Sequence, residues 1–105
     1  MKFGEYIRQA RESLQESDKS YSLRQVAIRI GIEPAYLSKI ERGDFKPPSE
    51  EVIVKLAAIL GEDKDVLLAM AGKFSSDLQQ IIMQRPKLFA ELLRQLKGAP
   101  DHAIV

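Results

Sequence analysis

Two short helical patterns joined across a glycine, in residues 22–43, constrain the fold of this chain more than any other feature of its sequence. In the first pattern, Val26 and Ile30 lie one helical turn apart. In the second pattern, Leu37 and Ile40 also lie one turn apart. Residues with this spacing share one face of a helix, so each segment presents an apolar stripe. The two stripes predict two short helices that pack on a common core.

Residues that begin or end helices mark the boundaries of both predicted helices. Ser22 and, three residues later, Gln25 form a capping box, which satisfies free N–H groups at a helix start. Pro34 is favoured at the first position of the second helix, where an N–H group would have no acceptor. Gly31 and Gly43 follow the two segments, and glycine adopts the left-handed conformation that ends a helix without steric cost. The boundaries therefore agree with the apolar spacing.

The turn between the two segments is short and is flanked by small or apolar residues. Two helices that cross at about 90 to 120° around a tight turn need such residues at fixed positions. Ala27 lies where a larger side chain would push the second helix away, and Ile32 fills the turn. This combination is typical of a helix-turn-helix, which binds DNA through its second helix. The alternative is a helical hairpin that serves only packing.

Helical periodicity continues on both sides of this motif. A first helix is predicted from about residue 2 to residue 16, and a polar surface linker lies in residues 15–21. Ser49 begins a further helix that Gly61 ends, and another short helix precedes Gly72. The residues expected in the core of these helices are Phe3, Ile7, Ala10, Leu14, Val52, Ile53, Leu56, Ala57, Leu60, Val66, Leu67 and Met70.

Residues 3–70 resemble the lambda-repressor and Cro-like regulators of bacteria and phages, often called the XRE family. The matching segments are SLRQVAIRIG, YLSKIERG, Pro47-Pro48-Ser49 and LAAILGEDKDVLL. The resemblance implies an all-α fold, with a five-helix lambda-repressor-like DNA-binding domain in residues 1–72. Its third helix, residues 34–42, would lie in the major groove of DNA. Residues 73–98 then form a C-terminal two-helix extension, and residues 99–105 form a tail that contains the sole histidine, His102.

The resemblance also implies which side chains of the third helix face base edges: Pro34, Ala35, Ser38 and Lys39. Lys39 can donate to O6 or N7 of guanine in the major groove. Ser38 can donate or accept a hydrogen bond, and Ala35 offers a methyl contact to thymine. We therefore expect these four residues to read the DNA sequence.

A second group of residues is expected to bind the DNA backbone, which positions a protein without reading sequence. Helix N-termini offer free N–H groups to anions, and the side chains of tyrosine, arginine and lysine donate to phosphate oxygens. The candidates are Ser22, Arg24, Gln25, Tyr36, Arg42 and Lys46. Lys46 can equally be a free surface lysine. Many family members carry glutamine where this chain has Leu23, so a contact made there by relatives is not carried over.

Arg11 of the first helix and Glu41 of the third are expected to form a structural ion pair. Arg11 lies on or beside the inner stripe of its helix, and in the resembled family an arginine at this place pairs with the glutamate that corresponds to Glu41. A half-buried pair would hold the two helices together, and loss of one partner would leave the other charge unpaired. The alternative is that both side chains are solvated at the surface.

Two more helices are predicted beyond Gly72. Ser76 and Gln79 form another capping box, and a last helix runs from Pro86 to Gly98. The apolar face of these helices consists of Leu78, Ile81, Ile82, Leu88, Phe89, Leu92, Leu93 and Leu96. This face can pack on the first and fifth helices of its own chain, or it can meet its copy in a twofold homodimer. We expect the homodimer, because regulators of this type gain specificity from two half-sites.

Composition argues against several other classes of protein. The 105 residues include no cysteine, so no disulfide and no thiolate metal site is expected. We expect no other metal and no cofactor either. No apolar run approaches the roughly 20 residues of a membrane span, so we expect no membrane association and a cytoplasmic location. The sequence has no triad spacing, phosphate-binding glycine loop or metal-ligand cluster. An enzyme is therefore not expected.

The charge distribution favours a nucleic-acid partner, although the net charge is only +1. Residues 19–46 hold six basic residues against three acidic ones, whereas residues 47–72 hold two against five. The basic segment contains the predicted DNA-reading helix, and a local basic surface attracts phosphate more than the net charge does.

These features predict a sequence-specific transcriptional regulator, a repressor that binds an inverted-repeat operator in double-stranded DNA as a homodimer. Activation in place of repression is also compatible with the sequence. One alternative is the antitoxin of a toxin–antitoxin pair, whose C-terminal helices bind a toxin protein while the helix-turn-helix controls the operon. Another is a coactivator-type domain that contacts proteins without reading bases. The accessible Tyr36, Lys39 and Arg42 favour DNA.

Overall fold

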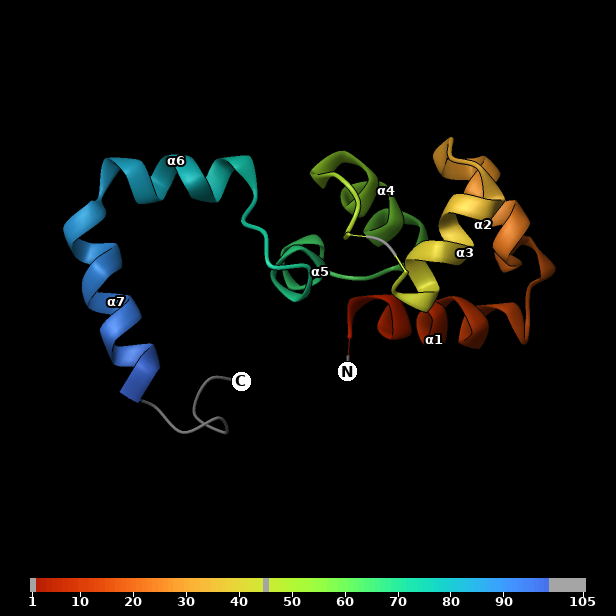
Figure 1. Ribbon diagram of the computed structural model, residues 1–105, viewed down its shortest axis with the longest axis horizontal. Coiled ribbons are helices and arrows are strands. Elements are labelled where there is room, and N and C mark those ends of the chain that lie inside the picture. The colour runs from red at the N-terminus through yellow and green to blue at the C-terminus, as the bar shows by residue number, and fades with distance from the viewer. Residues whose placement is uncertain (1, 45, 99–105) are drawn as a thin grey trace. The chain divides into compact units, whose positions relative to one another are not determined.

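The computed structural model describes residues 2–44 and 46–98, so the predicted tail with His102 lies outside the described residues. The chain divides into two compact units, Met1–Phe74 and Ser75–Val105. Every regular element in the described residues is a helix, which confirms the predicted all-α fold (Figure 1). None of these helices combines the length and the apolar character needed to cross a membrane.

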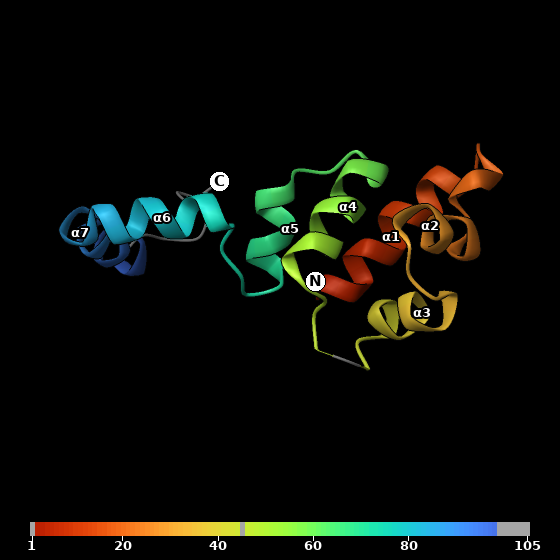
Figure 2. The same cartoon turned by 90° about the horizontal axis from the view of Figure 1, so that it is seen from above.

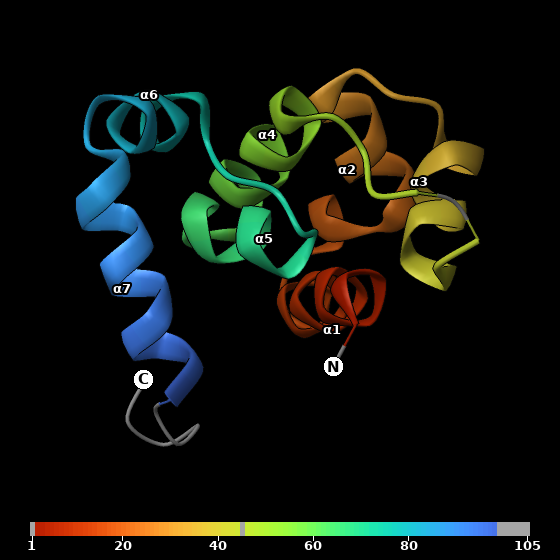
Figure 3. The ribbon, with the colours of Figure 1, turned by 60° about the vertical axis from the view of Figure 1, so that its left-hand side comes forward.

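The described part of the first unit contains five α-helices and one short 3-10 helix. In chain order they are α1 (Phe3–Gln15), the 3-10 helix η1 (Lys19–Tyr21), α2 (Leu23–Ile30), α3 (Pro34–Arg42), α4 (Glu50–Leu60) and α5 (Lys64–Met70). The helix α1 packs against α3 and α4, α4 packs against α5, and α2 contacts α3 and α4 (Figure 2). This arrangement leaves α3 at an edge of the unit (Figure 3).

Serine side chains cap the starts of α2 and α4. Oγ of Ser22 accepts a hydrogen bond from the backbone nitrogen of Gln25 at 3.2 Å, and Oγ of Ser49 accepts one from Val52 at 3.4 Å. The capping box predicted at Ser22 is only half formed, because the N–H group of Ser22 donates to the carbonyl oxygen of Lys19 at 3.1 Å. The backbone N–H group of Ser22 therefore bonds to η1, which was not predicted, and not to the side chain of Gln25.

A single hydrophobic core in the first unit includes residues from all five α-helices. Its buried members are Phe3, Ile7, Val26, Ala27, Ile30, Leu37, Ile40, Ile53, Leu56, Ala57, Leu60, Leu67 and Leu68. The prediction of Val66 as a core residue is wrong, because Val66 is 49% exposed and Leu68 is buried instead. Successive side chains of a helix are roughly 100° apart around its axis. The centre of the buried face lies between Leu67 and Leu68, so Val66 lies roughly 150° around the helix from it.

The first turn of α1 lies directly against the last turn of α3. A Cβ atom added to Gly4 would lie 2.3 Å from the carbonyl oxygen of Ile40 and 2.8 Å from that of Glu41. Real Cβ atoms do not approach backbone atoms this closely, so only glycine fits at this position. Gly4 therefore sets the distance between the two helices, a role that the sequence alone does not indicate.

We expect Gly4→Ala to lower the free energy of unfolding by about 1–3 kcal/mol, because the added methyl group meets backbone atoms that cannot rotate away. Urea denaturation measures this loss as a lower midpoint. Gly98→Ala is the matched control, since a Cβ atom at Gly98 meets nothing within 4 Å. Equal stability of the two variants would contradict the close approach of α1 to α3.

The described part of the second unit contains two helices that contact each other, α6 (Ser76–Gln84) and α7 (Pro86–Gly98). The helix α6 is capped by Ser75, whose Oγ accepts a hydrogen bond from the backbone nitrogen of Leu78 at 3.1 Å. The capping box predicted at Ser76 and Gln79 is therefore wrong by one residue. Ser75 and Ser76 are adjacent in the sequence. The backbone is extended at Ser75 and helical at Ser76, so Ser75 is the residue in the capping position.

The predicted apolar face of the second unit is largely exposed within that unit, and no residue of α6 or α7 is buried. Ile82 and Phe89 are half-buried. The exposed members of the face are Leu78, Ile81, Leu88, Leu92, Leu93 and Leu96, and their exposed fractions run from 37% to 62%. Two helices with this much apolar surface need a further contact to be stable.

Candidate nucleic-acid interface

The helices α2 and α3 form a helix-turn-helix with buried inner faces. Val26, Ala27 and Leu37 have no exposed surface. Gly31 ends α2 in the left-handed conformation, with φ of 81°, and the N–H group of Ile32 donates to the carbonyl oxygen of Ala27 at 3.0 Å. This hydrogen bond is typical of a glycine-terminated helix, and it fixes the direction in which the chain leaves α2. The orientation of α3 therefore depends on packed residues and a fixed turn.

The residues predicted to read bases lie on the solvent side of α3. Ala35 and Lys39 are exposed, and they lie one helical turn apart. Pro34 and Ser38 have the same spacing and are half-buried. The four residues thus form two adjacent rows along α3. A ligand that approaches this edge of the first unit can contact both rows.

Tyr36 has a different position from the one expected of a simple phosphate contact. Its side chain is half-buried and packs against the hydrophobic core. An open groove of about 470 Å³ lies beside it, and Lys46, Pro47 and Ser49 also line this groove together with the buried Pro48. The exposed Lys46 therefore lies beside α3, as expected for a residue just past that helix, and the proline pair forms the groove between them.

The first turn of α2 offers backbone N–H groups, which have no acceptor within the helix. Arg24 and Gln25 of this turn are exposed, whereas Ser22 is half-buried and its Oγ already accepts a hydrogen bond. An anion at this helix start can therefore bind the backbone N–H groups and the exposed side chains of Arg24 and Gln25.

Arg42, at the end of α3, is exposed but already takes part in two side-chain contacts. Its Nε atom lies 2.9 Å from Oδ2 of Asp44, and its Nη1 atom donates to Oγ of Ser38 at 3.3 Å. Arg42 is a predicted phosphate contact, and neither of these two interactions is part of that prediction.

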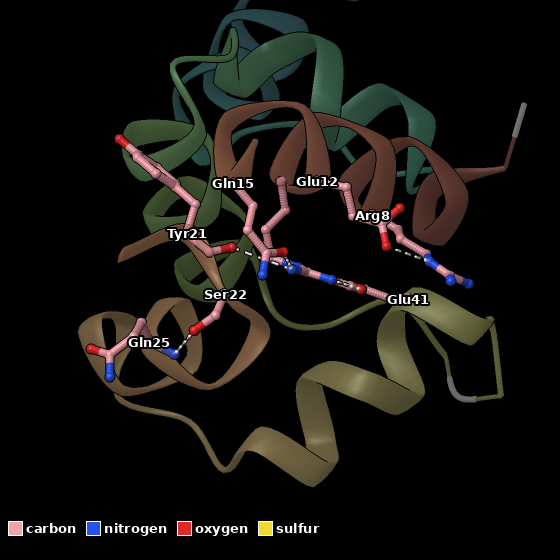
Figure 4. Close-up of polar contacts among 8 residues, drawn as sticks. Arg8, Glu12, Gln15, Tyr21, Ser22, Gln25 and Glu41 are labelled. Carbon is pink, nitrogen blue, oxygen red and sulfur yellow. Dashed lines mark hydrogen bonds and ion pairs between the residues drawn. The ribbon is translucent and has the colours of Figure 1, made fainter. Parts of the chain in front are cut away.

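Arg11 and Glu41 form a buried, two-pronged ion pair between α1 and α3 (Figure 4). Nε of Arg11 lies 2.7 Å from Oε2 of Glu41, and Nη2 donates to Oε1 at 3.0 Å. The side chains are only 6% and 4% exposed, so the alternative of two solvated side chains does not hold. Nη1 of Arg11 also donates to Oε1 of Gln15 and to the carbonyl oxygen of Tyr21. Hydrogen bonding to Glu41 raises the pKa of Arg11, although burial opposes this effect.

The linker predicted as a plain surface loop contains the ordered turn η1. Oδ1 of Asp18 accepts hydrogen bonds from Oγ and the backbone nitrogen of Ser20, at 2.7 and 2.9 Å, and these bonds lower the pKa of Asp18. The guanidinium of Arg29 lies 5.1 Å from the centre of the Tyr21 ring and donates to the carbonyl oxygen of Ser20. The sequence does contain a signal for this turn, namely Asp18 two residues before Ser20. An aspartate at this spacing favours a local turn. This turn holds the chain immediately before α2.

Known proteins with a helix-turn-helix domain are similar to the first unit of this chain. A family model described as a helix-turn-helix domain matches residues 2–70. An uncharacterized HTH-type transcriptional regulator of Mycobacterium tuberculosis (strain CDC 1551 / Oshkosh) is 38% identical over 69 residues, which are 66% of this chain and 45% of that protein. The regulator RghRB of Bacillus subtilis (strain 168), also described as uncharacterized, is 33% identical over 75% of this chain and 53% of its own length. The chain thus spans about half the length of these relatives.

A solved structure is similar over both units. A chain of the SinR protein/SinI protein complex is 27% identical to this chain and gives a TM-score of 0.53. The similarity covers 90% of this chain and 94% of the other one. It supports the five-helix, lambda-repressor-like reading of the first unit and extends beyond residue 70, where the family match ends.

Proposed function

The chain belongs to the helix-turn-helix domain family, and on this basis we propose that it is a sequence-specific DNA-binding regulator of transcription. Its proposed mode of action is repression, as a homodimer on an inverted-repeat operator. The observation that carries the proposal is the outer face of α3. This face exposes Ala35 and Lys39, while the opposite face is buried in the core.

The chemistry of this edge suits the major groove. The ammonium group of Lys39 can donate to guanine, and the methyl group of Ala35 can contact thymine. Arg24 and Lys46, both exposed, supply charge before and after α3 for contacts to phosphates. Base contacts would thus lie along the helix, and backbone contacts would come from the segments next to it.

The proposed homodimer rests on the exposed apolar face of α6 and α7. Burial of roughly 400 Å² of apolar surface per subunit, at about 25 cal/mol per Å², gives ~10 kcal/mol before the costs of association and ordering. A gain of this size is sufficient to hold a dimer. Two copies related by a twofold axis would present two copies of α3, which matches an inverted repeat.

Selection of binding sites from random DNA duplexes tests the proposal. We expect the selected duplexes to share an inverted repeat, and a salt titration of the best duplex to show the steep loss of affinity that phosphate contacts cause. Recovery of no common sequence would contradict sequence-specific regulation. Recovery of one half-site alone would contradict the dimer but not the reading of bases.

Lys39→Ala should relax the base preference at one position in each half-site, at a cost of about 1–3 kcal/mol, because a direct base contact is lost. Repeating the selection with the variant measures this change. Lys55→Ala is the control, since Lys55 is an exposed lysine on α4 that pairs with Glu51 at 3.2 Å. If Lys39→Ala weakens binding to all sequences alike, Lys39 contacts phosphate instead.

The same apolar face favours a second candidate function, the binding of a different protein. The solved chain that resembles this one comes from a complex of SinR with SinI, so a protein of this fold has a protein partner. An antitoxin that binds a toxin through α6 and α7 is one such case. The absence of a small toxin-like gene beside the gene for this chain would count against the antitoxin, and a homodimer that persists on DNA would favour the regulator.

A further inference from the structure

Three side chains at the C-terminal end of α3 form a connected set: Asp44, Arg42 and Ser38. Arg42 lies between the other two, with Nε 2.9 Å from Oδ2 of Asp44 and Nη1 donating to Oγ of Ser38 at 3.3 Å. Ser38 is one of the candidate base-reading residues, and Arg42 lies one helical turn after it. An arginine placed as a phosphate contact therefore also touches a residue placed as a base contact.

The position of Asp44 is fixed by the backbone. Gly43 ends α3 in the left-handed conformation, with φ of 75°, and its N–H group donates to the carbonyl oxygen of Ile40. The N–H group of Asp44 donates to the carbonyl oxygen of Lys39 at 3.0 Å. These two bonds close the end of the helix, and they hold Asp44 where its carboxylate meets Arg42.

The contact with Arg42 limits what Ser38 can do. A serine hydroxyl has one proton to donate and two lone pairs that accept. One lone pair of Ser38 accepts from the guanidinium, and within the described residues no acceptor takes the hydroxyl proton. A positive charge beside the oxygen also makes a second donor unfavourable there and strengthens the hydroxyl as a donor. The hydroxyl group of Ser38 is therefore available to donate a hydrogen bond and is not available to accept a second one.

We infer that Asp44 and Arg42 are positioning residues that make Ser38 a hydrogen-bond donor to DNA, an assignment that rests on the proposed function. In the major groove, guanine, adenine and thymine each present an acceptor, whereas cytosine presents only an amino donor. The base that accepts the hydrogen bond from Ser38 is therefore guanine, adenine or thymine, and not cytosine. Ser38 then has a specific role, in contrast to a serine that pairs with any base.

A phosphate contact alone makes a different prediction for Arg42. Contacts to the DNA backbone weaken or strengthen binding to all sequences alike, whereas positioning of Ser38 changes the preference at one base pair. The Arg42–Asp44 pair is exposed, with 55% and 56% of the two side chains accessible, so it contributes little to the stability of the fold. Variants of either residue should therefore remain folded.

The test uses the full chain, the duplex selected by it, and single-base variants of that duplex. Ser38→Ala first identifies the base pair whose preference depends on the hydroxyl. We expect cytosine to be disfavoured at that position by roughly three- to tenfold, the effect of one hydrogen bond. Arg42→Gln and Asp44→Asn should each lose most of this discrimination. Asp44→Asn should also bind all duplexes more tightly, because an acidic group near DNA is removed.

Arg94→Gln is the control, because Arg94 is also an exposed arginine, at 70%, and pairs with Glu91 at 2.9 Å on α7. It should leave the preference at the Ser38 position unchanged. A preference for cytosine at that position, or variants of Arg42 and Asp44 that change only the overall affinity, would overturn the inference and leave the proposed function intact. If the wild-type chain selects no sequence, both fail. Thermal unfolding of each variant confirms that the chain is folded.

Discussion

Glu41→Ala should lower the free energy of unfolding of this chain by about 3–5 kcal/mol. Arg11 would keep its contacts with Gln15 and Tyr21, but it would lose the carboxylate that neutralises it in a site where its side chain is 6% exposed. A guanidinium does not lose its proton in a protein, so the charge stays buried. Urea denaturation at pH 7 measures the loss, at one protein concentration because association affects stability.

Two controls separate the buried pair from a general effect of the substitution. In the double variant Arg11→Met with Glu41→Leu, no charge is left buried, so most of the lost stability should return. Glu12→Ala removes the partner of Arg8 in an exposed pair and should cost less than about 1 kcal/mol. A cost for Glu41→Ala no larger than that for Glu12→Ala would show that the pair does not hold α1 to α3.

A chain that ends at Phe74 should fold, stay monomeric, and bind the selected inverted repeat roughly 10²–10⁴-fold more weakly than the full chain. Among the described residues, every member of the buried hydrophobic core lies in the first unit, so we expect this unit to fold without α6 and α7. Loss of the dimer removes the simultaneous contact with two half-sites, which is the source of the extra affinity. Light scattering and gel-shift titration measure the two effects.

Single substitutions in the full chain provide the control for this truncation. Leu92→Glu places a charge on the apolar face of α7, where the side chain is 49% exposed in the single chain, and should also abolish the dimer. Gln80→Glu adds the same charge to an exposed polar position of α6 outside the apolar face, and should leave the dimer intact. If the chain ending at Phe74 remains a dimer, the interface lies in the first unit.

The helix boundaries of the first unit can be predicted from the sequence because the residues that set them act locally. Pro34 begins α3, and Gly31 and Gly43 end α2 and α3, as expected. The errors occur where a choice depends on the rest of the fold. Val66 and Leu68 are both apolar, and the sequence does not show which way a short helix faces.

The candidate site is predictable only in part. The pairing of Arg11 with Glu41 follows from a family resemblance, because 30 residues separate the two partners in the sequence. The contacts of Arg42 span only four residues to Ser38 and two to Asp44, so helical spacing did carry a signal for them. The close approach at Gly4 depends instead on how α1 and α3 meet in space. Local sequence carries no signal for such contacts. The apolar face of α6 and α7 is plain in the sequence, but its partner is not.

The proposed function depends above all on the claim that the outer face of α3 reads base sequence. The most direct test is the ratio of two dissociation constants, one for the selected duplex and one for a scrambled duplex of the same length and composition, at one physiological salt concentration. We expect the scrambled duplex to bind at least about 10³-fold more weakly. A ratio near one would contradict the claim, because contacts to phosphates alone would then account for all of the binding.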